Sequence, residues 1–290
     1  SFTIEKGETL GVVGESGCGK STLGRTIIHL QEPTDGQIFL NGEDITHVKG
    51  KELDRIRDKM QIVFQDPYSS LNPRIRIEST IKEPLKHSGR FHGKSEIQAE
   101  ADRLMELVGI DERLRQSYPH ELDGGRRQRV GIARALALNP EFIVCDEPVS
   151  ALDVSIQAQV LNLLMDLQEK MGVAYMFVTH DLSVVRHISN HICVMYLGQL
   201  VEKAPTEELF LHTLHPYTKA LLSAIPSTDI FHPMQRVRLK GEITSPIDPE
   251  PGCRFAARCP YATEACKQPQ KLTEVEPGHF VSCCRVKEIN

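Results

Sequence analysis

The hydrophobic residues of this chain fall either into short continuous runs or into longer stretches where they recur at helical spacing. Runs at 10–13, 142–145 and 173–178 have the length and the content of β-branched or aromatic residues typical of buried strands. After the first run, Leu23, Ile27 and Leu30 are spaced by four and three residues, which predicts a helix with one apolar stripe against a sheet. Strands that alternate with helices favour an α/β domain with a mainly parallel sheet.

The segment at 67–139 has a helical pattern. Ser95 and Gln98 predict a capping box at the start of one helix, and Gly109 predicts its end. The apolar residues of that helix recur at spacings of 4, 3 and 4, at Ile97, Ala101, Leu104 and Val108. We therefore expect a helical insertion within the α/β domain.

The composition changes again at residue 226, where prolines become frequent and long apolar repeats become few. This change indicates a small irregular module at 226–290. We expect the α/β core to consist of residues 1–66 and 140–225, interrupted by the helical segment at 67–139. The chain begins at Ser1 and enters a strand-like run within nine residues, so we also expect an incomplete amino-terminal part of the core.

Composition and charge exclude several classes of protein. With 40% hydrophobic and 25% charged residues, the chain is not expected to be disordered, and its net charge of −5 does not favour nucleic acid as a partner. No apolar stretch reaches the roughly 18 to 20 residues that a membrane-spanning helix requires. The first ten residues include Glu5, Lys6 and Glu8, where a signal peptide would be apolar. Any role at a membrane therefore requires partner chains.

A glycine-rich segment directly after the first strand fits the phosphate-binding loop pattern, in which four residues separate two glycines and Lys-Ser follows. Glycines let backbone N–H groups turn toward phosphates, Lys20 reaches the terminal phosphates, and the Ser21 hydroxyl binds Mg²⁺ at the start of a helix. A simple glycine turn is the alternative. The segment consists of Gly14, Glu15, Ser16, Gly17, Cys18, Gly19, Lys20, Ser21 and Thr22.

Polar residues at the ends of the two later strands suit phosphoryl transfer. Asp146 and Glu147 follow the run at 142–145, and we expect Asp146 to hold Mg²⁺ through water while Glu147 activates the attacking water. His180 follows the run at 173–178, at the strand end where parallel α/β sheets bind ligands. An exposed acidic turn and a purely structural histidine are the alternatives.

The order of these motifs along the chain resembles that of the ATP-binding subunit of an ABC transporter, a P-loop NTPase. Gln65 lies between the phosphate-binding loop and a Leu-x-Gly-Gly segment, and Asp153 follows the Asp-Glu pair. The segments at 65–73, 146–157 and 215–218 further resemble those of the oligopeptide and dipeptide importer family, and Val149-Ser150 resembles its F-type subunit. The Leu-x-Gly-Gly segment consists of Leu122, Asp123, Gly124 and Gly125.

This resemblance implies a RecA-like core that uses ATP and Mg²⁺, and a head-to-tail pair with a D-type paralogue. Each ATP would lie between one subunit's phosphate-binding loop and the other's Leu-x-Gly-Gly segment. Gln65 would sense Mg²⁺ and the attacking water, His180 would contact the γ-phosphate, and Asp153 would bridge the subunits. The resemblance also implies an aromatic residue on adenine from upstream of Phe2, so the chain beginning at Ser1 is expected to bind nucleotide weakly.

The implied function is hydrolysis of ATP to energise peptide import. The implied partners are two transmembrane permease subunits and an extracytoplasmic solute-binding protein, with this chain at the cytoplasmic face of the membrane. One alternative keeps the motor but changes the cargo to nickel or another small solute. A second alternative is a soluble non-transport ABC ATPase acting on nucleic acid or the ribosome, which the acidic balance disfavours.

The Leu-x-Gly-Gly segment departs from the family pattern Leu-Ser-Gly-Gly-Gln, because Asp123 and Arg126 replace serine and glutamine. A carboxylate about 4 Å from a phosphate is repelled by roughly 4 kcal/mol at an effective dielectric of about 20. One hypothesis is that the ATP site formed with this segment is weakened. The other is that Arg126 or Arg127 neutralises Asp123, or that its carboxylate turns away.

Five of the eight cysteines lie in the last 38 residues, and Cys253, Cys259, Cys266 and Cys283 offer four thiolates. The family resemblance implies that these four bind a [4Fe-4S] cluster; zinc and free thiols remain alternatives, although the Cys-x2-Cys pairs of many structural zinc sites are absent. Disulfides are disfavoured for a chain expected in the cytosol. We expect no metal role for the remaining cysteines, which are Cys18, Cys145, Cys193 and Cys284.

Overall fold

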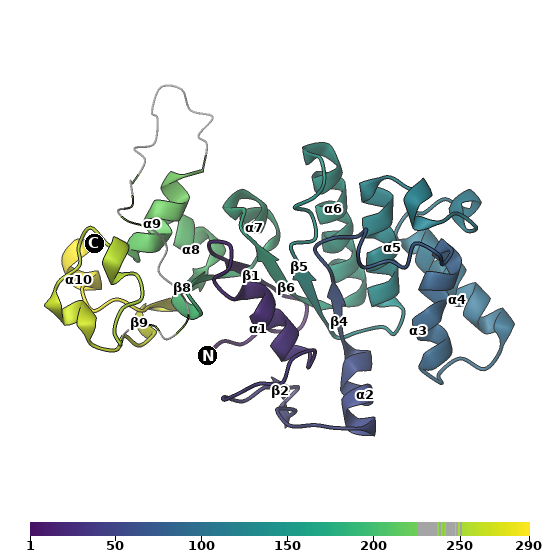
Figure 1. Cartoon of the computed structure of the whole chain (residues 1–290), viewed down its shortest axis with the longest axis horizontal. Coiled ribbons are helices and arrows are strands. Elements are labelled where there is room, and N and C mark those ends of the chain that lie inside the picture. Colours follow the sequence, from purple (N-terminus) through teal and green to yellow (C-terminus); the bar gives the residue numbers. More distant parts are fainter. Residues whose placement is uncertain (226–236, 238, 240, 242–246, 248, 250) are drawn as a thin grey trace. The chain divides into compact units, whose positions relative to one another are not determined.

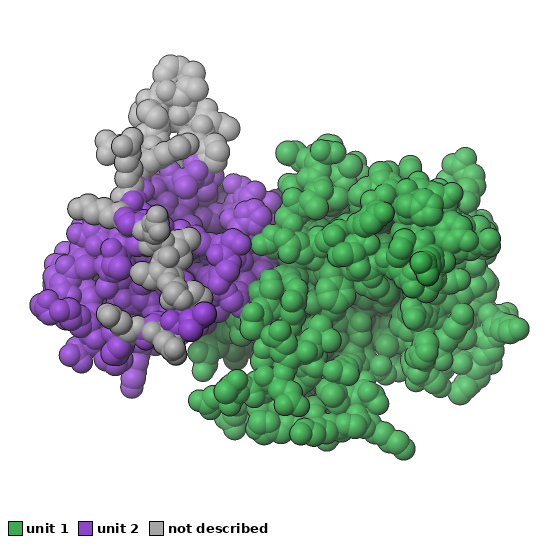
Figure 2. Space-filling view, viewed as in Figure 1, with its two compact units in different colours: residues 1–8, 21–176 green, residues 9–20, 177–290 purple. Residues whose placement is uncertain are grey.

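The computed structural model describes residues 1–225, 237, 239, 241, 247, 249 and 251–290. The chain forms two compact units, one of residues 1–8 and 21–176 and the other of residues 9–20 and 177–290 (Figure 2). The predicted boundary at residue 226 lies outside the described residues. Within the described part of the chain, every helix is too short or too polar to span a lipid bilayer.

The first unit combines parallel strands with helices. Strand β4 pairs in parallel with β5, from Met60 opposite Phe142 to Val63 opposite Cys145, and every residue of β5 is buried. The run predicted at 142–145 is thus confirmed as a strand. The elements are β2 (Phe39–Leu40), β3 (Glu43–Asp44), α2 (Lys51–Lys59), β4 (Met60–Val63), α3 (Ile77–His87), α4 (Lys94–Leu107), η1 (Glu112–Leu114), η2 (Pro119–Glu121), α5 (Gly124–Leu136), β5 (Phe142–Asp146) and α6 (Val154–Met171).

Helices α3, α4 and α5 pack on one another and are grouped together in Figure 1. The helix predicted from the repeat that begins at Ile97 is confirmed as α4. Its predicted capping box is wrong, because the helix begins at Lys94 after Gly93, without a side-chain cap. Gln98 instead donates its amide hydrogens to the carboxylates of Glu78 and Asp102, at 2.6 and 2.8 Å.

Helix α1 (Lys20–Ile27) is confirmed, and Leu23 and Ile27 of its predicted apolar stripe are half-buried, but the third position is wrong. Leu30 lies beyond the end of the helix and is 48% exposed. The face turned toward the sheet carries Gly24, which approaches β5 so closely that an added Cβ would lie 2.7 Å from Val144 Cγ1. The close approach of α1 to β5 therefore depends on a small residue at this position.

In the second unit the strands have the order β1-β7-β8-β10-β9. Strand β1 pairs in parallel with β7, and the neighbouring strands that follow are antiparallel. Strand β6 (Ala174–Thr179) has residues in both units, and with β1 it confirms the strands predicted at 173–178 and 10–13. The elements are β1 (Thr9–Val13), α7 (Leu182–Ile188), β7 (His191–Tyr196), β8 (Gln199–Pro205), α8 (Thr206–Leu211), α9 (Pro216–Ser223), η3 (Ala256–Arg258), η4 (Glu264–Lys267), β9 (Thr273–Glu276), β10 (His279–Val281) and α10 (Val286–Ile289).

The tail therefore adds two strands to a sheet, which the sequence pattern did not predict. Its short helix η3 is preceded by Phe255, whose ring packs against Tyr196 and Tyr217 with centroids 5.3 Å away in each case. All three rings are buried, and they belong to the same hydrophobic core as Val13 at the end of β1. This core fixes the tail next to the segment that follows β1.

Candidate nucleotide-binding site

The phosphate-binding loop leaves the buried strand β1 and ends at Lys20, the first residue of α1. Lys20 is 5% exposed, and its ammonium donates to the carbonyls of Gly14 and Glu15 at 2.8 and 3.0 Å. Gly17 and Gly19 have φ angles of +78° and +100°, which side chains rarely permit. The loop thus has the turned backbone and the fixed cation that phosphate binding requires.

Cys18 lies in this loop as a packed thiol. Burial raises the pKa of its thiol, an effect that Lys20 partly opposes. The other two cysteines outside the tail are also buried, and burial raises the pKa of Cys193 to about 12 and that of Cys145 further. These surroundings agree with the packing role expected for all three.

Ser21 and Asp146 form the part of the site suited to a cation. The Ser21 hydroxyl donates to Asp146 Oδ1 at 2.6 Å, although the residues are 125 positions apart. Asp146 is 1% exposed, and its other oxygen lies 3.4 Å from Arg25 Nη2. A hydroxyl and a buried carboxylate in contact are oxygen donors of the kind Mg²⁺ prefers, so these residues fit the expected ion.

Glu147 and Gln65 meet beside this pair. Gln65 Nε2 donates to Glu147 Oε2 at 3.0 Å. Glu147 has a φ of +48°, a left-handed conformation that is costly for a residue with a side chain. The end of β5 therefore holds Asp146 buried and Glu147 in a strained conformation next to Gln65. This arrangement is consistent with the roles expected for the three residues.

His180 and Asp153 occupy exposed positions at element ends. His180 directly follows β6 and belongs to the same unit as the phosphate-binding loop, and Asp181 next to it caps α7 by accepting from Ser183 N at 2.8 Å. Asp153 precedes α6, and the first residue of that helix, Val154, is 82% exposed. Both predicted residues are exposed.

Asp123 caps helix α5. Its Oδ1 accepts from the backbone N–H of Arg126 at 2.8 Å, and its Oδ2 lies 3.3 Å from Arg126 Nη1. Aspartate is as good an N-cap as serine, so the substitution leaves the start of this helix intact. Of the two hypotheses for Asp123, the geometry favours neutralisation by Arg126.

Two residues that sequence reasoning missed contact the phosphate-binding loop. The backbone N–H of Glu15 donates to the Tyr217 hydroxyl at 2.9 Å. Arg258 donates through both terminal nitrogens to the carboxylate of Glu15, at 2.8 and 3.1 Å, and its side chain is only 10% exposed. No local pattern could reveal a pair 243 positions apart, although Tyr217 lies in the His-Pro-Tyr-Thr segment already singled out.

The four cysteines predicted as ligands lie near one another in the tail. Burial, together with the nearby thiols of Cys266, Cys283 and Cys259, raises the pKa of Cys253 to about 11. The Cys253 N–H also donates to the carbonyl of Cys266 at 2.8 Å. Cys284, expected to take no part, has its sulfur 4.0 Å from that of Cys266.

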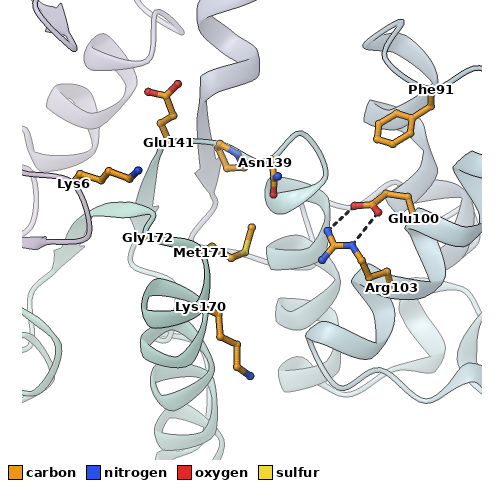
Figure 3. Close-up of a pocket in the computed structure, with 10 residues that line it drawn as sticks. Lys6, Phe91, Glu100, Arg103, Asn139, Glu141, Lys170, Met171 and Gly172 are labelled. Carbon is orange, nitrogen blue, oxygen red and sulfur yellow. Dashed lines mark hydrogen bonds and ion pairs between the residues drawn. The ribbon is translucent and has the colours of Figure 1, made fainter.

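A separate pocket of about 650 Å³ lies in the first unit (Figure 3). Its wall includes Glu100 and Arg103 of α4, joined by two hydrogen bonds, and Lys170 near the end of α6. None of the residues predicted for nucleotide binding lines it.

Comparison with known proteins identifies two family profiles in the chain. The profile of the ABC transporter family matches residues 1–150, and that of the oligopeptide/dipeptide transporter C-terminal region matches residues 201–266. The chain is 52% identical to the oligopeptide transport ATP-binding protein AppF of Bacillus subtilis over 98% of its own length and 87% of the relative's. It is 48% identical to the dipeptide transport ATP-binding protein DppF of Haemophilus influenzae, over 99% and 88% of the two chains.

Solved structures show the same fold. The protein cbiO1 of Clostridium perfringens, part of the ABC transporter complex cbiONQ, matches with a TM-score of 0.66 and 27% identity, over 73% of this chain and 82% of that one. The ATP-binding cassette MJ0796, solved as a dimer bound to ADP and Pi, matches with a TM-score of 0.63 and 31% identity, over 71% and 88%. The expected α/β fold with a mainly parallel sheet is confirmed. The chain therefore belongs to the ABC transporter family, in the group of oligopeptide and dipeptide transport ATP-binding proteins.

Proposed function

We propose that this chain binds and hydrolyses ATP to energise the import of dipeptides or oligopeptides. The similarity to transport ATP-binding proteins over nearly the whole chain supports the cargo class. The observation that carries the enzymatic part is the set of contacts at the end of β5, where Ser21 meets Asp146 and Gln65 meets Glu147. These contacts bring oxygen donors for Mg²⁺ next to a carboxylate that can act as a base.

Each residue has a defined role in the proposed reaction, in which water displaces ADP from the γ-phosphorus and inorganic phosphate is released. The loop from Gly14 to Thr22, including Lys20, would bind the phosphates, and Ser21 and Asp146 would hold Mg²⁺, which would neutralise phosphate charge. Glu147 accepts the proton of the attacking water, and Gln65 orients that water. His180 donates to the γ-phosphate.

The proposed working form is a head-to-tail pair with a paralogous D-type subunit. Leu122, Asp123, Gly124 and Gly125 of this chain would face the partner's ATP, with Arg126 neutralising the Asp123 carboxylate. Asp153 would bridge the subunits, and its exposed position before α6 leaves it accessible to a partner chain. Two permease subunits and an extracytoplasmic binding protein would complete the transporter, with this chain at the cytoplasmic face of the membrane.

We assign the parts of the chain to roles by the ranges predicted from the sequence. Residues 1–66 and 140–225 would form the nucleotide-binding core, 67–139 the helical part that faces permease and partner, and 226–290 the importer-type module. A cargo of nickel or another small solute is the second candidate. The names of the relatives favour peptides over it.

We propose further that Cys253, Cys259, Cys266 and Cys283 bind a [4Fe-4S] cluster. In a tetrahedral zinc site with Zn–S bonds of about 2.3 Å, the four sulfurs lie roughly 3.8 Å apart. Among the described residues, no three of these thiols have all their sulfurs within 4.8 Å of one another. A [4Fe-4S] cluster binds each cysteine through a different iron, so it requires its sulfurs to stand farther apart than a zinc site does.

Substitution of Glu147 by glutamine tests the enzymatic proposal. We expect Glu147→Gln to lower ATP turnover of the assembled transporter by about 100-fold or more while ATP still binds, because the base is lost but the phosphate contacts remain. Peptide uptake should fall in parallel. The control is Glu141→Gln, just before the other end of β5, where the carboxylate pairs with Lys59. Unchanged turnover in Glu147→Gln would contradict the proposal, and uptake of nickel but not peptide would favour the second cargo.

The cluster proposal is tested by visible absorption and electron paramagnetic resonance spectra of anaerobically purified protein, with iron and zinc counted. We expect about four irons per chain, lost when Cys259 is replaced by serine and retained in the Cys193→Ser control. Zinc without iron, or no metal at all, would exclude the cluster.

A further inference from the structure

Glu202 is a fully buried carboxylate in β8 with three hydrogen-bond donors. One oxygen accepts from the backbone N–H of Leu214 at 2.7 Å, and the other accepts from that of His215 at 3.1 Å. The same oxygen that binds Leu214 lies 2.8 Å from His279 Nε2. A carboxylate oxygen accepts hydrogen bonds, so Nε2 of His279 is the donor in this contact and carries the proton.

This contact defines the state of His279, which lies in β10 and is also fully buried. With the proton on Nε2, the other ring nitrogen Nδ1 has a free lone pair. Nδ1 is buried and has no hydrogen-bond partner in the described residues. A buried nitrogen without a partner is costly unless something binds it.

Two carboxylates face this imidazole. Glu276 lies opposite His279 in the β9–β10 hairpin, and Glu208 lies in α8, which directly follows β8 (Figure 1). Ligand atoms of the two glutamates and His279 all lie within 4.8 Å of one another. Neither glutamate forms an ion pair with a lysine or arginine of the described chain. Three acceptor groups thus converge, and the only ion-pair partner of the two glutamates in the described chain is His212, next to Glu208.

We propose that Glu208, Glu276 and His279 Nδ1 bind a divalent first-row transition metal cation. Two carboxylates and one imidazole are a donor set shared by Mn²⁺, Fe²⁺ and Zn²⁺, and Glu202 behind the imidazole is the outer carboxylate that orients a metal-binding histidine. Bonds of about 2.0–2.2 Å require the ligand atoms to close to roughly 3.4 Å. Glu276 is exposed and Glu208 half-buried, so both can move toward the buried nitrogen.

His212 stands beside this site. Its Nδ1 lies 2.6 Å from Glu208 Oε1, and its side chain is 67% exposed. The cation would therefore replace the histidine next to Glu208 or take it as a fourth ligand. Either way the cation connects α8 to the hairpin, and β10 leads directly to Cys283. The site would stabilise the part of the tail that carries this cysteine.

The experiment is a titration of the nucleotide-free full chain with Mn²⁺, followed by the electron paramagnetic resonance signal of the free ion. Mn²⁺ prefers oxygen and nitrogen donors, so the tail thiols compete little. We expect the unmodified chain to bind one Mn²⁺ at this site. The double variant Glu208→Gln with Glu276→Gln should lose that ion or bind it at least tenfold more weakly. Zn²⁺ should displace this Mn²⁺, since it binds such donors more tightly.

The control double variant is Glu207→Gln with Glu274→Gln. Glu207 pairs with Arg186, and Glu274 accepts from Gly278 N, so these carboxylates share the two elements without joining the cluster. Weak binding at Asp146 is common to all three proteins and cancels. The proposal is overturned if the test variant binds Mn²⁺ as well as the unmodified chain does. It is also overturned if the control variant loses as much Mn²⁺ binding as the test variant. All exchanged residues are exposed or half-buried, and a circular dichroism spectrum checks that the variants fold.

Discussion

At the scale of single residues, the contact between Arg258 and Glu15 connects the tail to the phosphate-binding loop. Lysine cannot reproduce its paired hydrogen bonds, so Arg258→Lys should leave the loop less fixed. Hydrogen bonds to charged groups contribute about 1.5–3 kcal/mol. Losing part of this energy in the variant should weaken the affinity for ATP roughly three- to tenfold. Equilibrium binding of a fluorescent ATP analogue measures this affinity. Arg285→Lys is the control, because Arg285 pairs with Glu288, away from the loop. Equal affinity in both variants would contradict a positioning role for Arg258.

Asp123 and Arg126 give a second prediction at this scale. Since Arg126 lies next to the Asp123 carboxylate, Asp123→Ser should change ATP turnover of the assembled transporter by less than about twofold. Arg126→Gln should lower turnover more, because it leaves the carboxylate without its partner near the other subunit's phosphate. Steady-state phosphate release compares the variants. A large gain in turnover for Asp123→Ser would instead support the hypothesis of a weakened site.

At the scale of elements, the close approach of α1 to β5 depends on a glycine. Gly24→Ala would place a Cβ 2.7 Å from Val144 Cγ1, so we expect the free energy of unfolding to fall by about 1–3 kcal/mol. Gly131→Ala inside α5 is the matched control, since a Cβ there meets no described atom within 4 Å. This variant should raise the free energy of unfolding by about 0.5–1 kcal/mol. Urea unfolding curves test both. A change of the same sign in the free energy of unfolding of both variants would refute the packing argument.

Elements with a strong hydrophobic run could be predicted from the sequence, and contacts between small or polar residues could not. β5 and the placement of Asp146 and Glu147 at its end follow from an uninterrupted apolar run. Gly24 and Gln98 were missed because hydrophobicity does not mark a close approach by glycine, and a glutamine that could cap a helix can also join a network with Glu78. The tail strands are short, and β9 carries two glutamates, so they lack the pattern of a buried strand.

The candidate site divides in the same way. The phosphate-binding loop could be predicted because its residues are adjacent in the chain, whereas the direct contact of Ser21 with Asp146, 125 positions away, was implied only by the Mg²⁺ role expected for each. Arg258 and Tyr217 reach the loop only once the tail has folded onto the core around Phe255. Their role depends on packing between distant segments, which no local pattern records.

At the scale of the whole molecule, a buried histidine should limit stability in acid. His215 is 1% exposed, and burial lowers its pKa from 6.5 to about 4, although Glu202 opposes the change. The unfolded chain takes up a proton near pH 6.5, whereas the folded chain stays neutral at this site until about pH 4. The unfolded state therefore binds more protons between these values, and the free energy of unfolding falls as the pH drops through this window.

The variant His215→Asn separates this effect from general acid unfolding. Asparagine can still accept from Tyr217 N, as His215 Nδ1 does at 3.1 Å, and it does not titrate. Between pH 7 and 5 we expect the unmodified chain to lose stability faster than the variant, by at most about 1.4 kcal/mol per pH unit. Chemical unfolding at several pH values gives the two slopes. Parallel slopes would show that His215 keeps its ordinary pKa in the fold. A steeper fall confined to pH values below about 4 would point to carboxylates instead, because their protonation destabilises salt-bridged proteins in that range.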